Sequence, residues 1–528
     1  MKLLRYYYMS VFCILLIACF EDKGNYDYTE LNVPVIEGIH TQEWYEKFAN
    51  VDTLRINPKI TCRLEESESN WEYEWLLMPI HAGYNKDSVV ISEQREGYVI
   101  GREKNLVYPV KGKAGQYAGF FLVKNKITGV TYKTDFYLKL RTAIGDGWMI
   151  LCEEDGKARL DMISYRAEDT NFISRDIWHG SDFPLGKPYR LFYNFNQTKS
   201  DRLVWSENGT WGLEGETLWP SQETDLALQF VESPGKVEIA GSCVCMNTTP
   251  EREILVTSAG ELYMRNYYDI AIGAFFDYPR NKIEGQEVYY RLSDQIGFRP
   301  YWAWPTTTAV LFYDMDNRRF LSLENDDEFL SEVSFSSTGN VSFSAKTGKD
   351  MVHMEGNMEG YVFAVLVEPG TSEYYCYGMS LQPDCKVFCT HQVKLLPANT
   401  DRITHFAFHP LYRLLYYATE QGDVYAFNMN TPNVKAEKIL SFPGEKIAVM
   451  KFNYPAPFVR YEGWEKARWN WIYIATNRDE LSEHECGVVR MYDVSEITLK
   501  PKKKFEFDKF GKIVDMKYRF RGDEAITQ

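Results

Sequence analysis

The chain has 528 residues, of which 45% are apolar and 25% are charged, so it is long enough for two or more domains and is globular rather than disordered. Aromatic residues reach 15%, a level that suits β-rich structure. The net charge of −15 argues against a nucleic-acid-binding protein, because such a protein needs a basic surface.

The N-terminus has the pattern of a lipoprotein signal peptide. A positively charged start precedes an apolar stretch that is too short to span a bilayer and that ends in "LIAC" at residues 16–19. This ending resembles a bacterial lipobox, so we expect residues 1–18 to be removed and Cys19 to carry the lipid anchor. The alternative is an ordinary secretory signal with a chance cysteine.

Two acidic residues follow this cysteine closely. Glu21 and Asp22 resemble the surface-export signal of Bacteroidota lipoproteins, which implies a protein that is anchored to the outer membrane and faces outward. We expect residues 19–31 to form a flexible acidic tether.

Residues 32–141 have the pattern of a β-sandwich, because short apolar strands alternate with turn residues. In "NWEYEWLLM", from Asn70, aromatic side chains alternate onto one face, and two later strands are expected to form a hairpin across residues 125–129. Gly115-x-Tyr117 resembles the tyrosine-bearing corner of immunoglobulin-like domains. Residues 142–147 are expected to be a linker.

Three stretches together resemble one family. "CFEDKGNYDY", "YEWLL" and "GWMILCEEDGKARLDMIS" are similar to the PKD-like lipoproteins of Bacteroidota, and the resemblance extends to about residue 165. Members of that family are usually encoded beside SusC/SusD-type outer-membrane importers. The resemblance therefore implies a PKD-like spacer or docking domain, with a SusC-like transporter and a SusD-like lipoprotein as partners.

A weak repeat begins after the linker. An apolar strand, a turn rich in Gly, Asn or Asp, and a second apolar strand occur at intervals of 51 to 57 residues. The hairpins begin at Trp148, Leu203, Ile254, Val310, Val362, Leu414 and Trp471. This regularity predicts a seven-bladed β-propeller over residues 148–528, and thus an all-β protein.

The C-terminal stretch "KIVDMKYRF", residues 512–520, has no hairpin after it. It resembles "KIAVMKFNY", residues 446–454, which stands upstream of the last hairpin. Six of the seven hairpins have such an upstream strand, and the hairpin at Trp148 lacks one. We therefore predict that residues 512–520 pair with the Trp148 strand and close the ring, since closure removes exposed strand edges. An open β-sandwich with a frayed tail is the alternative.

The sequence contains no convincing catalytic or metal-binding motif, so we expect no catalytic residue, cofactor or metal. Asp314, Asp316 and Asn317 in "DMDN" resemble part of a calcium loop, but the following Gly and Glu are missing, and a turn explains them better. His405 and His409 lie four residues apart on a predicted strand, about 13 Å, too far to share a metal. A dispersed pair of catalytic carboxylates would leave no sequence signal.

Eight cysteines remain beyond Cys13 and Cys19. An even number in an exported protein is compatible with disulfides. Four of them lie inside apolar strand patterns, where cysteine often acts as a small core residue, and we expect these to be buried thiols: Cys152, Cys243, Cys245 and Cys376.

The connection between the first two strands of the last repeat is long and aromatic. Its candidate ligand- or partner-binding residues are Tyr454, Phe458, Arg460, Tyr461, Trp464, Arg468 and Trp469. Tyr, Trp and Arg are enriched at binding hot spots, and flat aromatic rings also stack on sugars. The alternative is an aromatic plug packed under its own blade. A second cluster, "RPYWAWP" from Arg299, is expected to be core.

These features together predict a surface-exposed, non-catalytic lipoprotein that serves a SusC/SusD-type importer and binds an oligopeptide or a glycan. Peptides are favoured, because the Trp clusters lack the Asn, Asp and Gln partners that often accompany sugar platforms. A surface hydrolase or lyase on the propeller is an alternative, which convergent carboxylates or a histidine pair at the central channel would favour. An adhesin or structural surface protein is a further alternative.

Overall fold

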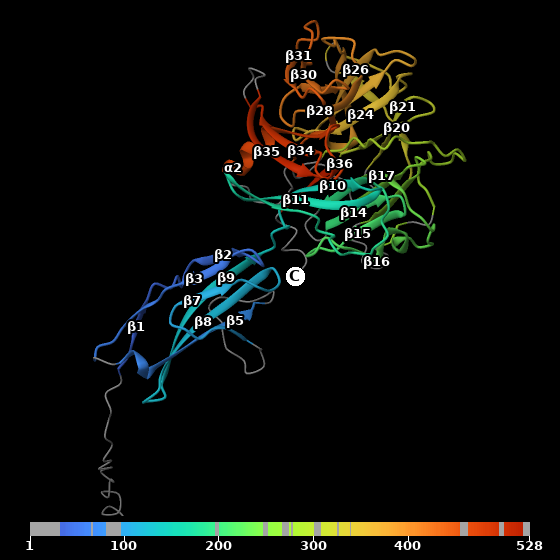
Figure 1. Cartoon of the computed structure of the whole chain (residues 1–528). Coiled ribbons are helices and arrows are strands. Elements are labelled where there is room, and N and C mark those ends of the chain that lie inside the picture. The colour runs from blue at the N-terminus through green and yellow to red at the C-terminus, as the bar shows by residue number, and fades with distance from the viewer. Residues whose placement is uncertain are drawn as a thin grey trace, which may run out of the picture.

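The computed structural model describes most of the chain, namely residues 32–64, 67–80, 97–195, 200–245, 252–266, 274–275, 278–299, 308–324, 327–337, 339, 341–454, 463–495 and 501–520. Within these ranges the chain is all-β, and the one α-helix is the short α2 (Gly463–Ala467). Figure 1 shows an elongated N-terminal group of strands, in blue, and a larger β-propeller-like body. Cys19, Glu21 and Asp22 lie outside the described residues.

The N-terminal strands form three sheets in the order β2-β9-β8-β5-β6, β1-β4 and β3-β7. Their bounds are β1 (Val35–Glu37), β2 (Trp44–Phe48), β3 (Thr53–Ile56), β4 (Lys59–Thr61), β5 (Trp71–Pro79), β6 (Tyr98–Gly101), β7 (Leu106–Pro109), β8 (Gly115–Asn125) and β9 (Thr131–Arg141). The predicted hairpin across residues 125–129 is confirmed, since β8 and β9 pair antiparallel.

The core of this sandwich is aromatic, as the alternation in the sequence predicts. Trp75 of β5 is fully buried, stacks on Phe121 of β8 with ring centroids 4.1 Å apart, and donates its indole N–H to the Glu103 carbonyl at 2.8 Å. The Tyr117 hydroxyl donates to the carbonyl of Lys113, four residues upstream, at 2.8 Å. This backbone contact is the one expected of a tyrosine corner.

The larger body contains seven separate sheets among the described residues. Their orders are β12-β11-β10-β36, β13-β14-β15-β16, β17-β18-β19, β20-β21-β22, β23-β27-β26-β25-β24, β28-β29-β30-β31 and β32-β33-β34-β35. The bounds of the first eleven strands are β10 (Gly147–Glu154), β11 (Lys157–Ala167), β12 (Thr170–Ser174), β13 (Pro188–Phe195), β14 (Ser200–Ser206), β15 (Gly209–Leu213), β16 (Pro220–Asp225), β17 (Ile239–Cys245), β18 (Arg252–Thr257), β19 (Leu262–Asn266) and β20 (Val310–Asp314).

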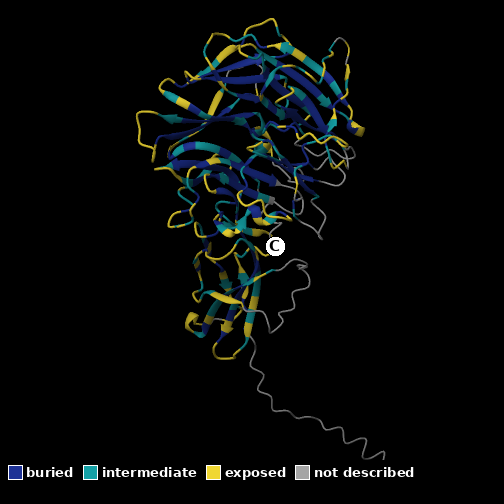
Figure 2. Cartoon of the chain, turned by 90° about the vertical axis from the view of Figure 1, so that its right-hand side faces the viewer, coloured by how far each residue is buried: buried dark blue, intermediate teal, exposed yellow. Residues whose placement is uncertain are grey.

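The remaining strands are β21 (Arg319–Leu323), β22 (Ser331–Glu332), β23 (Phe335–Ser337), β24 (Asp350–Gly356), β25 (Tyr361–Val367), β26 (Tyr374–Leu381), β27 (Val387–Lys394), β28 (Ile403–Phe408), β29 (Leu414–Thr419), β30 (Asp423–Asn428), β31 (Glu437–Ser441), β32 (Glu445–Phe452), β33 (Trp471–Arg478), β34 (Gly487–Asp493), β35 (Lys502–Phe510) and β36 (Lys512–Arg519). All seven predicted hairpins form antiparallel pairs, one in each sheet. Figure 2 shows that burial follows these strands, while exposed residues gather in the connections.

The predicted pairing of the C-terminal strand is confirmed. β36 runs antiparallel to β10, with Trp148 opposite Tyr518 and Ile150 opposite Met516. Met516 is fully buried in a cluster formed by residues of the first and last sheets. The chain therefore joins residues more than 360 positions apart in one sheet.

The predicted strand at Arg299 lies almost entirely outside the described residues. In the segment just before it, Leu292 and Gly297 form isolated antiparallel bridges with Asp314 and Leu311. Five of the six strands predicted upstream of hairpins are present as β13, β17, β24, β28 and β32.

The eight described cysteines are free thiols, and seven of them are buried. The prediction of buried thiols is thus confirmed for Cys152, Cys243, Cys245 and Cys376. Cys243 and Cys245 lie on β17 with their sulfur atoms 3.5 Å apart, and burial raises the pKa of Cys243.

The sandwich contacts the larger body through Arg166 of β11. The Arg166 guanidinium lies over the Phe48 ring, 4.6 Å from its centroid, and forms an ion pair with Asp52 at 3.3 Å. Within the described part of the chain, no helix is long and apolar enough to cross a membrane.

Candidate functional site

A cavity of about 620 Å³ is lined mainly by edge strands of six sheets and by a segment that bridges to the seventh sheet. The six edge strands are β13, β17, β24, β28, β32 and β36. The seventh segment comprises residues 294–298, which bridge to β20. The volume lies within the range of small-molecule sites, about 300–1,000 Å³.

The six edge strands share a β-bulge at the same place. In each strand one residue is left without a partner in the neighbouring strand, and all six of these residues line the cavity: Tyr189, Ala240, Val352, Thr404, Ala448 and Val514. A bulge bends its strand and re-aims the next side chains, and bulges often lie beside functional sites. The bulge therefore acts as a repeated structural device around the cavity.

Polar contacts link successive segments on one side of the cavity. The Asp515 carboxylate of β36 accepts the Leu191 N–H of β13 at 2.9 Å. Arg190 of β13 donates to the Ala240 carbonyl of β17 and to Asp294 at 2.7 Å. Packing adds to these contacts, because a Cβ atom on Gly241 would lie 2.3 Å from the Asp294 carbonyl oxygen.

The contacts continue around the other side. The Gln295 side chain accepts the Met354 N–H of β24 at 3.4 Å, and Glu355 of β24 accepts the Phe408 N–H of β28. A ring nitrogen of His405 lies 3.0 Å from the Ala448 carbonyl of β32.

The last link runs from β32 to β36. Lys451 donates to Asp515 at 3.0 Å and to the Met516 carbonyl at 2.6 Å. The series of contacts thus returns to the strand where it began.

Four charged side chains on the cavity wall are neutralised by partners within the protein. Arg190 pairs with Asp294 and Lys451 pairs with Asp515. Burial alone would raise the pKa of Asp515, but Lys451, the Leu191 N–H and other favourable contacts outweigh it and lower that pKa. Asp515 is therefore a carboxylate at neutral pH.

Two further charged groups on the wall lack a partner of opposite charge. Lys517 of β36 has no hydrogen bond or ion pair among the described residues, and burial, reinforced by Lys451, lowers its pKa to about 8. Glu355 has no Lys or Arg partner in the described part of the chain, and a ring nitrogen of His353 lies 3.4 Å from its carboxylate.

Among the described candidate residues of the aromatic loop, Tyr454 lines the cavity. Its hydroxyl is buried beside Glu355, and burial, followed by the charge of Glu355 and a hydrogen bond to it, raises the pKa of Tyr454. Phe458, Arg460 and Tyr461 of this loop lie outside the described residues.

The C-terminal part of the loop packs between the last and first sheets. Arg468 is buried, with the Tyr165 ring centroid at 3.4 Å and the Trp464 ring centroid at 4.4 Å. It also donates to the carbonyls of Ala167 and Glu168, each at 3.3 Å. Trp464 and Trp469 are half-buried. The role of this loop in binding stays a prediction.

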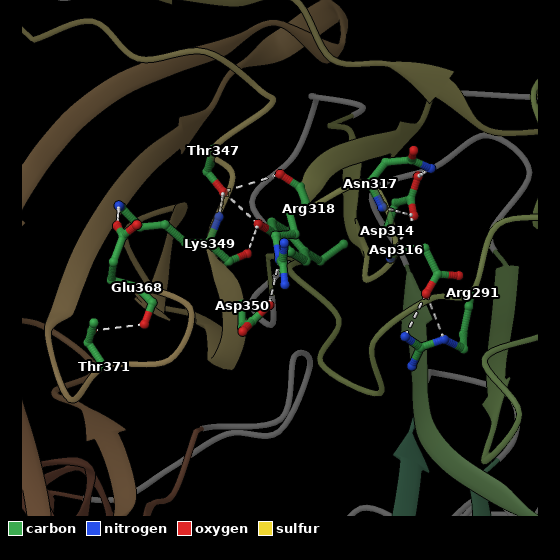
Figure 3. Close-up of polar contacts among 11 residues, drawn as sticks. Arg291, Asp314, Asp316, Asn317, Arg318, Thr347, Lys349, Asp350, Glu368 and Thr371 are labelled. Atoms are coloured by element: carbon green, nitrogen blue, oxygen red, sulfur yellow. Dashed lines mark hydrogen bonds and ion pairs between the residues drawn. The ribbon is translucent and has the colours of Figure 1, made fainter.

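The "DMDN" segment is a turn between β20 and β21, as predicted (Figure 3). One oxygen of Asp314 accepts the N–H groups of Asp316 and Asn317 at 3.2 and 3.1 Å, and the other accepts from Arg319 at 3.1 Å. Asp316 pairs with Arg291 at 2.6 Å. These carboxylates are satisfied by the turn and by arginine. Among the described residues, no group of three or more His, Cys, Asp or Glu side chains could hold a metal ion.

The two histidines of "HFAFHP" lie in different surroundings. His405 lines the cavity, whereas His409 is buried beyond the end of β28. One ring nitrogen of His409 accepts the Leu411 N–H at 3.1 Å, and burial lowers its pKa to about 3. His409 is thus a neutral structural residue.

Sequence reasoning missed most charged residues of the cavity, including Arg190, Glu355, Lys451 and Lys517. One signal was available, because Lys451 and Lys517 occupy the same position in "KIAVMKFNY" and "KIVDMKYRF". A charged residue repeated inside an apolar edge strand indicates a polar surface shared by several repeats.

Comparisons with known proteins give one family match. Residues 19–182 match the PKD-like family, which confirms that part of the resemblance for these residues. A comparison with curated proteins gives no significant match.

Several solved structures are similar at low identity. A quinonprotein alcohol dehydrogenase-like protein from Bacteroides thetaiotaomicron is 11% identical, with a TM-score of 0.39, over 92% of this chain and 97% of that one. The complex of KlAtg21 with the coiled coil of AgAtg16 is 11% identical, with a TM-score of 0.37, over 69% and 99%. AztD of Citrobacter koseri is 10% identical, with a TM-score of 0.32, over 84% and 96%. Structural similarities at this level do not indicate a ligand or an activity for this chain.

Proposed function

We propose that this protein is a non-catalytic, surface-exposed outer-membrane lipoprotein that binds a nutrient, an oligopeptide or a glycan, for a SusC/SusD-type importer. The lipobox at Cys19, the acidic residues Glu21 and Asp22, and the PKD-like match over residues 19–182 support the anchoring part of this proposal. The larger body supplies the binding part.

In this proposal the seven sheets are the blades of one propeller, and the pairing of β10 with β36 closes its ring. Two observations support this architecture. The bulge repeats in six edge strands, and polar contacts or close packing link each segment to the next around the cavity. Closure leaves short, protected strand edges, the usual solution of propellers.

The observation that best supports a binding role is the cavity with two charged groups, Lys517 and Glu355, that lack a partner of opposite charge among the described residues. Lys517 and Glu355 are half-buried. Withdrawing a charged group from water in part, without a partner of opposite charge, has a cost in stability, so a fold that needed only stability would pair the charge or replace it. Lys517 and Glu355 are instead held on the wall of a cavity large enough for a small organic molecule. Perturbed titratable groups in a cleft are typical of functional sites.

A hydrolase or lyase is the second candidate, and one observation favours it. His353 and His405 both line the cavity, together with carboxylates. A neutral histidine beside a carboxylate can act as a general base. Under this alternative, purified protein would release products from glycans, and His353→Ala and His405→Ala would abolish the release. Under the binding proposal, ligand is recovered intact from the complex.

The binding role is tested with full-length protein, libraries of oligopeptides and glycans, and a variant that fills the cavity. Val352 lines the cavity and is 37% exposed, whereas Val434 is 61% exposed and does not line it. Val352→Trp should abolish binding, and Val434→Trp should leave it unchanged. Equal binding by both variants would refute a ligand site in this cavity.

The importer association has a separate test. A pull-down from detergent-solubilised outer membranes should recover a SusC-like transporter and a SusD-like lipoprotein with the protein. Recovery of neither partner would remove that part of the proposal while leaving the cavity as a ligand site.

A further inference from the structure

The two charged groups of the cavity that lack a partner of opposite charge, Lys517 and Glu355, differ in sign. Their signs indicate the charges of the ligand, an inference that rests on the proposed binding function. The wall holds three cationic and three anionic side chains: Arg190, Lys451, Lys517, Asp294, Glu355 and Asp515. Four of them form two ion pairs, Arg190 with Asp294 at 2.7 Å and Lys451 with Asp515 at 3.0 Å. One ammonium and one carboxylate are left over.

The first of these groups, Lys517, is a ready anion site. The positive charges of Lys451 and Arg190 disfavour the charged form of Lys517. The Asp515 carboxylate, whose charge favours that form, already accepts hydrogen bonds from Lys451 and from the Leu191 N–H. A ligand carboxylate would supply the missing counter-charge and accept hydrogen bonds from Lys517. Charge-assisted hydrogen bonds of this kind are among the stronger polar contacts.

The second group, Glu355, is a ready cation site. One carboxylate oxygen accepts the Phe408 N–H, and the contact with His353 at 3.4 Å involves a ring nitrogen that has no hydrogen-bond partner in the described part of the chain. An ammonium group of a ligand would give Glu355 the opposite charge that the described residues do not provide.

The two groups cannot satisfy each other, because they belong to well-separated strands. The hydrogen bonds around the cavity lead from β36 to β32, then to β28 and then to β24. Lys517 and Glu355 are thus three segments apart, and no ion pair joins them. A single ligand that spans the cavity would reach both.

We infer that the cavity binds a zwitterionic ligand, with a carboxylate at Lys517 and an ammonium group at Glu355, as a short peptide with free termini provides. Of the two ligand classes in the proposed function, this assignment favours an oligopeptide over a glycan. An acidic glycan would match Lys517 but would place no cation at Glu355, and a neutral glycan would match neither.

The test uses full-length protein and defined mixtures of tripeptides, with native mass spectrometry and calorimetry as the measurements. Peptides with both termini free should bind about tenfold or more tightly than the same peptides acetylated at the N-terminus or amidated at the C-terminus, since each change removes one charge. Equal binding of free and blocked peptides would overturn the inference and leave the cavity as a binding site.

Charge-removing variants separate the two ends of the ligand. Lys517→Met should lose the preference for a free C-terminus and keep that for a free amine, whereas Glu355→Gln should do the reverse. Lys517→Arg keeps the charge and should keep both preferences. Lys446→Met, on the exposed end of β32, is the control and should bind as wild type does.

Glycans complete the experiment. If neutral or uronate-containing oligosaccharides bind in a manner that Val352→Trp abolishes, and tripeptides do not bind, the inference is wrong and the proposed binding function stands. If neither class binds, the proposed function fails and the inference fails with it.

Discussion

Removing residues 511–528 is expected to unfold the larger body, because the deletion takes away β36. Three apolar side chains of this strand are buried: Ile513 at 2% exposure, Met516 at 0% and Tyr518 at 9%. At about 1.5–3 kcal/mol for each, their lost burial amounts to roughly 5–9 kcal/mol. The whole stability of an ordinary domain is about 5–15 kcal/mol, so the truncated body should not remain folded at physiological temperature.

The deletion has electrostatic consequences as well. Lys451 loses both the Asp515 carboxylate and the Met516 carbonyl, and the edge of β10 that faces β36 loses its backbone hydrogen-bond partners.

A single substitution tests the packing of β36 separately from its hydrogen bonds. Met516→Ala should lower the free energy of unfolding by about 2–5 kcal/mol. Val434→Ala, on an exposed residue of the same body, should change the free energy of unfolding by less than about 0.5 kcal/mol.

Thermal unfolding followed by circular dichroism, with limited proteolysis, measures these effects. Proteolysis of the truncated protein should leave a resistant fragment that corresponds to the N-terminal sandwich. A disulfide between Glu153→Cys and Lys512→Cys, residues that face each other across β10 and β36, should raise the unfolding temperature. Unfolding of the truncated protein at the wild-type temperature would refute this account of how the two ends are held.

Three further predictions concern single residues. Arg468→Lys should destabilise the protein by about 1–3 kcal/mol in urea unfolding, because lysine cannot reproduce the planar stacking and the paired carbonyl bonds of arginine; an unchanged midpoint would show that this contact is dispensable. Lys517→Met should stabilise the free protein by about 1–3 kcal/mol at pH 7, since burial disfavours the lysine charge. The native pKa of about 8 lies below the unfolded value near 10.4, so the unfolded wild type binds more protons between these pH values, and the advantage of the variant should shrink as pH rises from about 8 to 10. A difference that does not vary with pH would contradict this assignment. Cys19→Ala should abolish palmitate labelling, whereas replacing Glu21 and Asp22 by Ala should leave the lipid and reduce protease accessibility on whole cells; unchanged labelling of Cys19→Ala would show that the lipid is elsewhere.

Most of the strand pairs could be predicted because they are local. The hairpin at Leu414 joins β29 and β30 across a short turn, so apolar pattern and turn residues suffice to define it. The buried thiols followed from the same patterns. The strand expected in "RPYWAWP" stays a prediction, because residues 300–305 of that stretch lie outside the described residues.

The candidate site was harder to predict because its residues are far apart in sequence. Arg190 and Asp294 meet across 104 positions, and Lys451 and Asp515 meet across 64. Arg190, Lys451 and Asp515 lie in strands where the sequence does not distinguish a charged residue that faces the cavity from one that faces outward, and Asp294 lies outside the strands. The aromatic loop, by contrast, was conspicuous in sequence, yet its Arg468 packs between two sheets rather than at the cavity.

The sequence by itself determined the two-part all-β organisation, the PKD-like character of the first part, and the pairing of residues 512–519 with the Trp148 strand. The strand organisation and the pairing of the C-terminal strand depend on periodicity and on the requirement that strand edges be paired, which one sequence expresses directly. The PKD-like character followed instead from the resemblance of quoted stretches to that family. Only the tertiary structure decided which charges face one another. A one-residue bulge in an edge strand changes where the next side chains point, and leaves no mark in the apolar pattern. The uncompensated charges of Lys517 and Glu355 depend on which partners lie within hydrogen-bond reach, and those partners come from strands brought together by the fold.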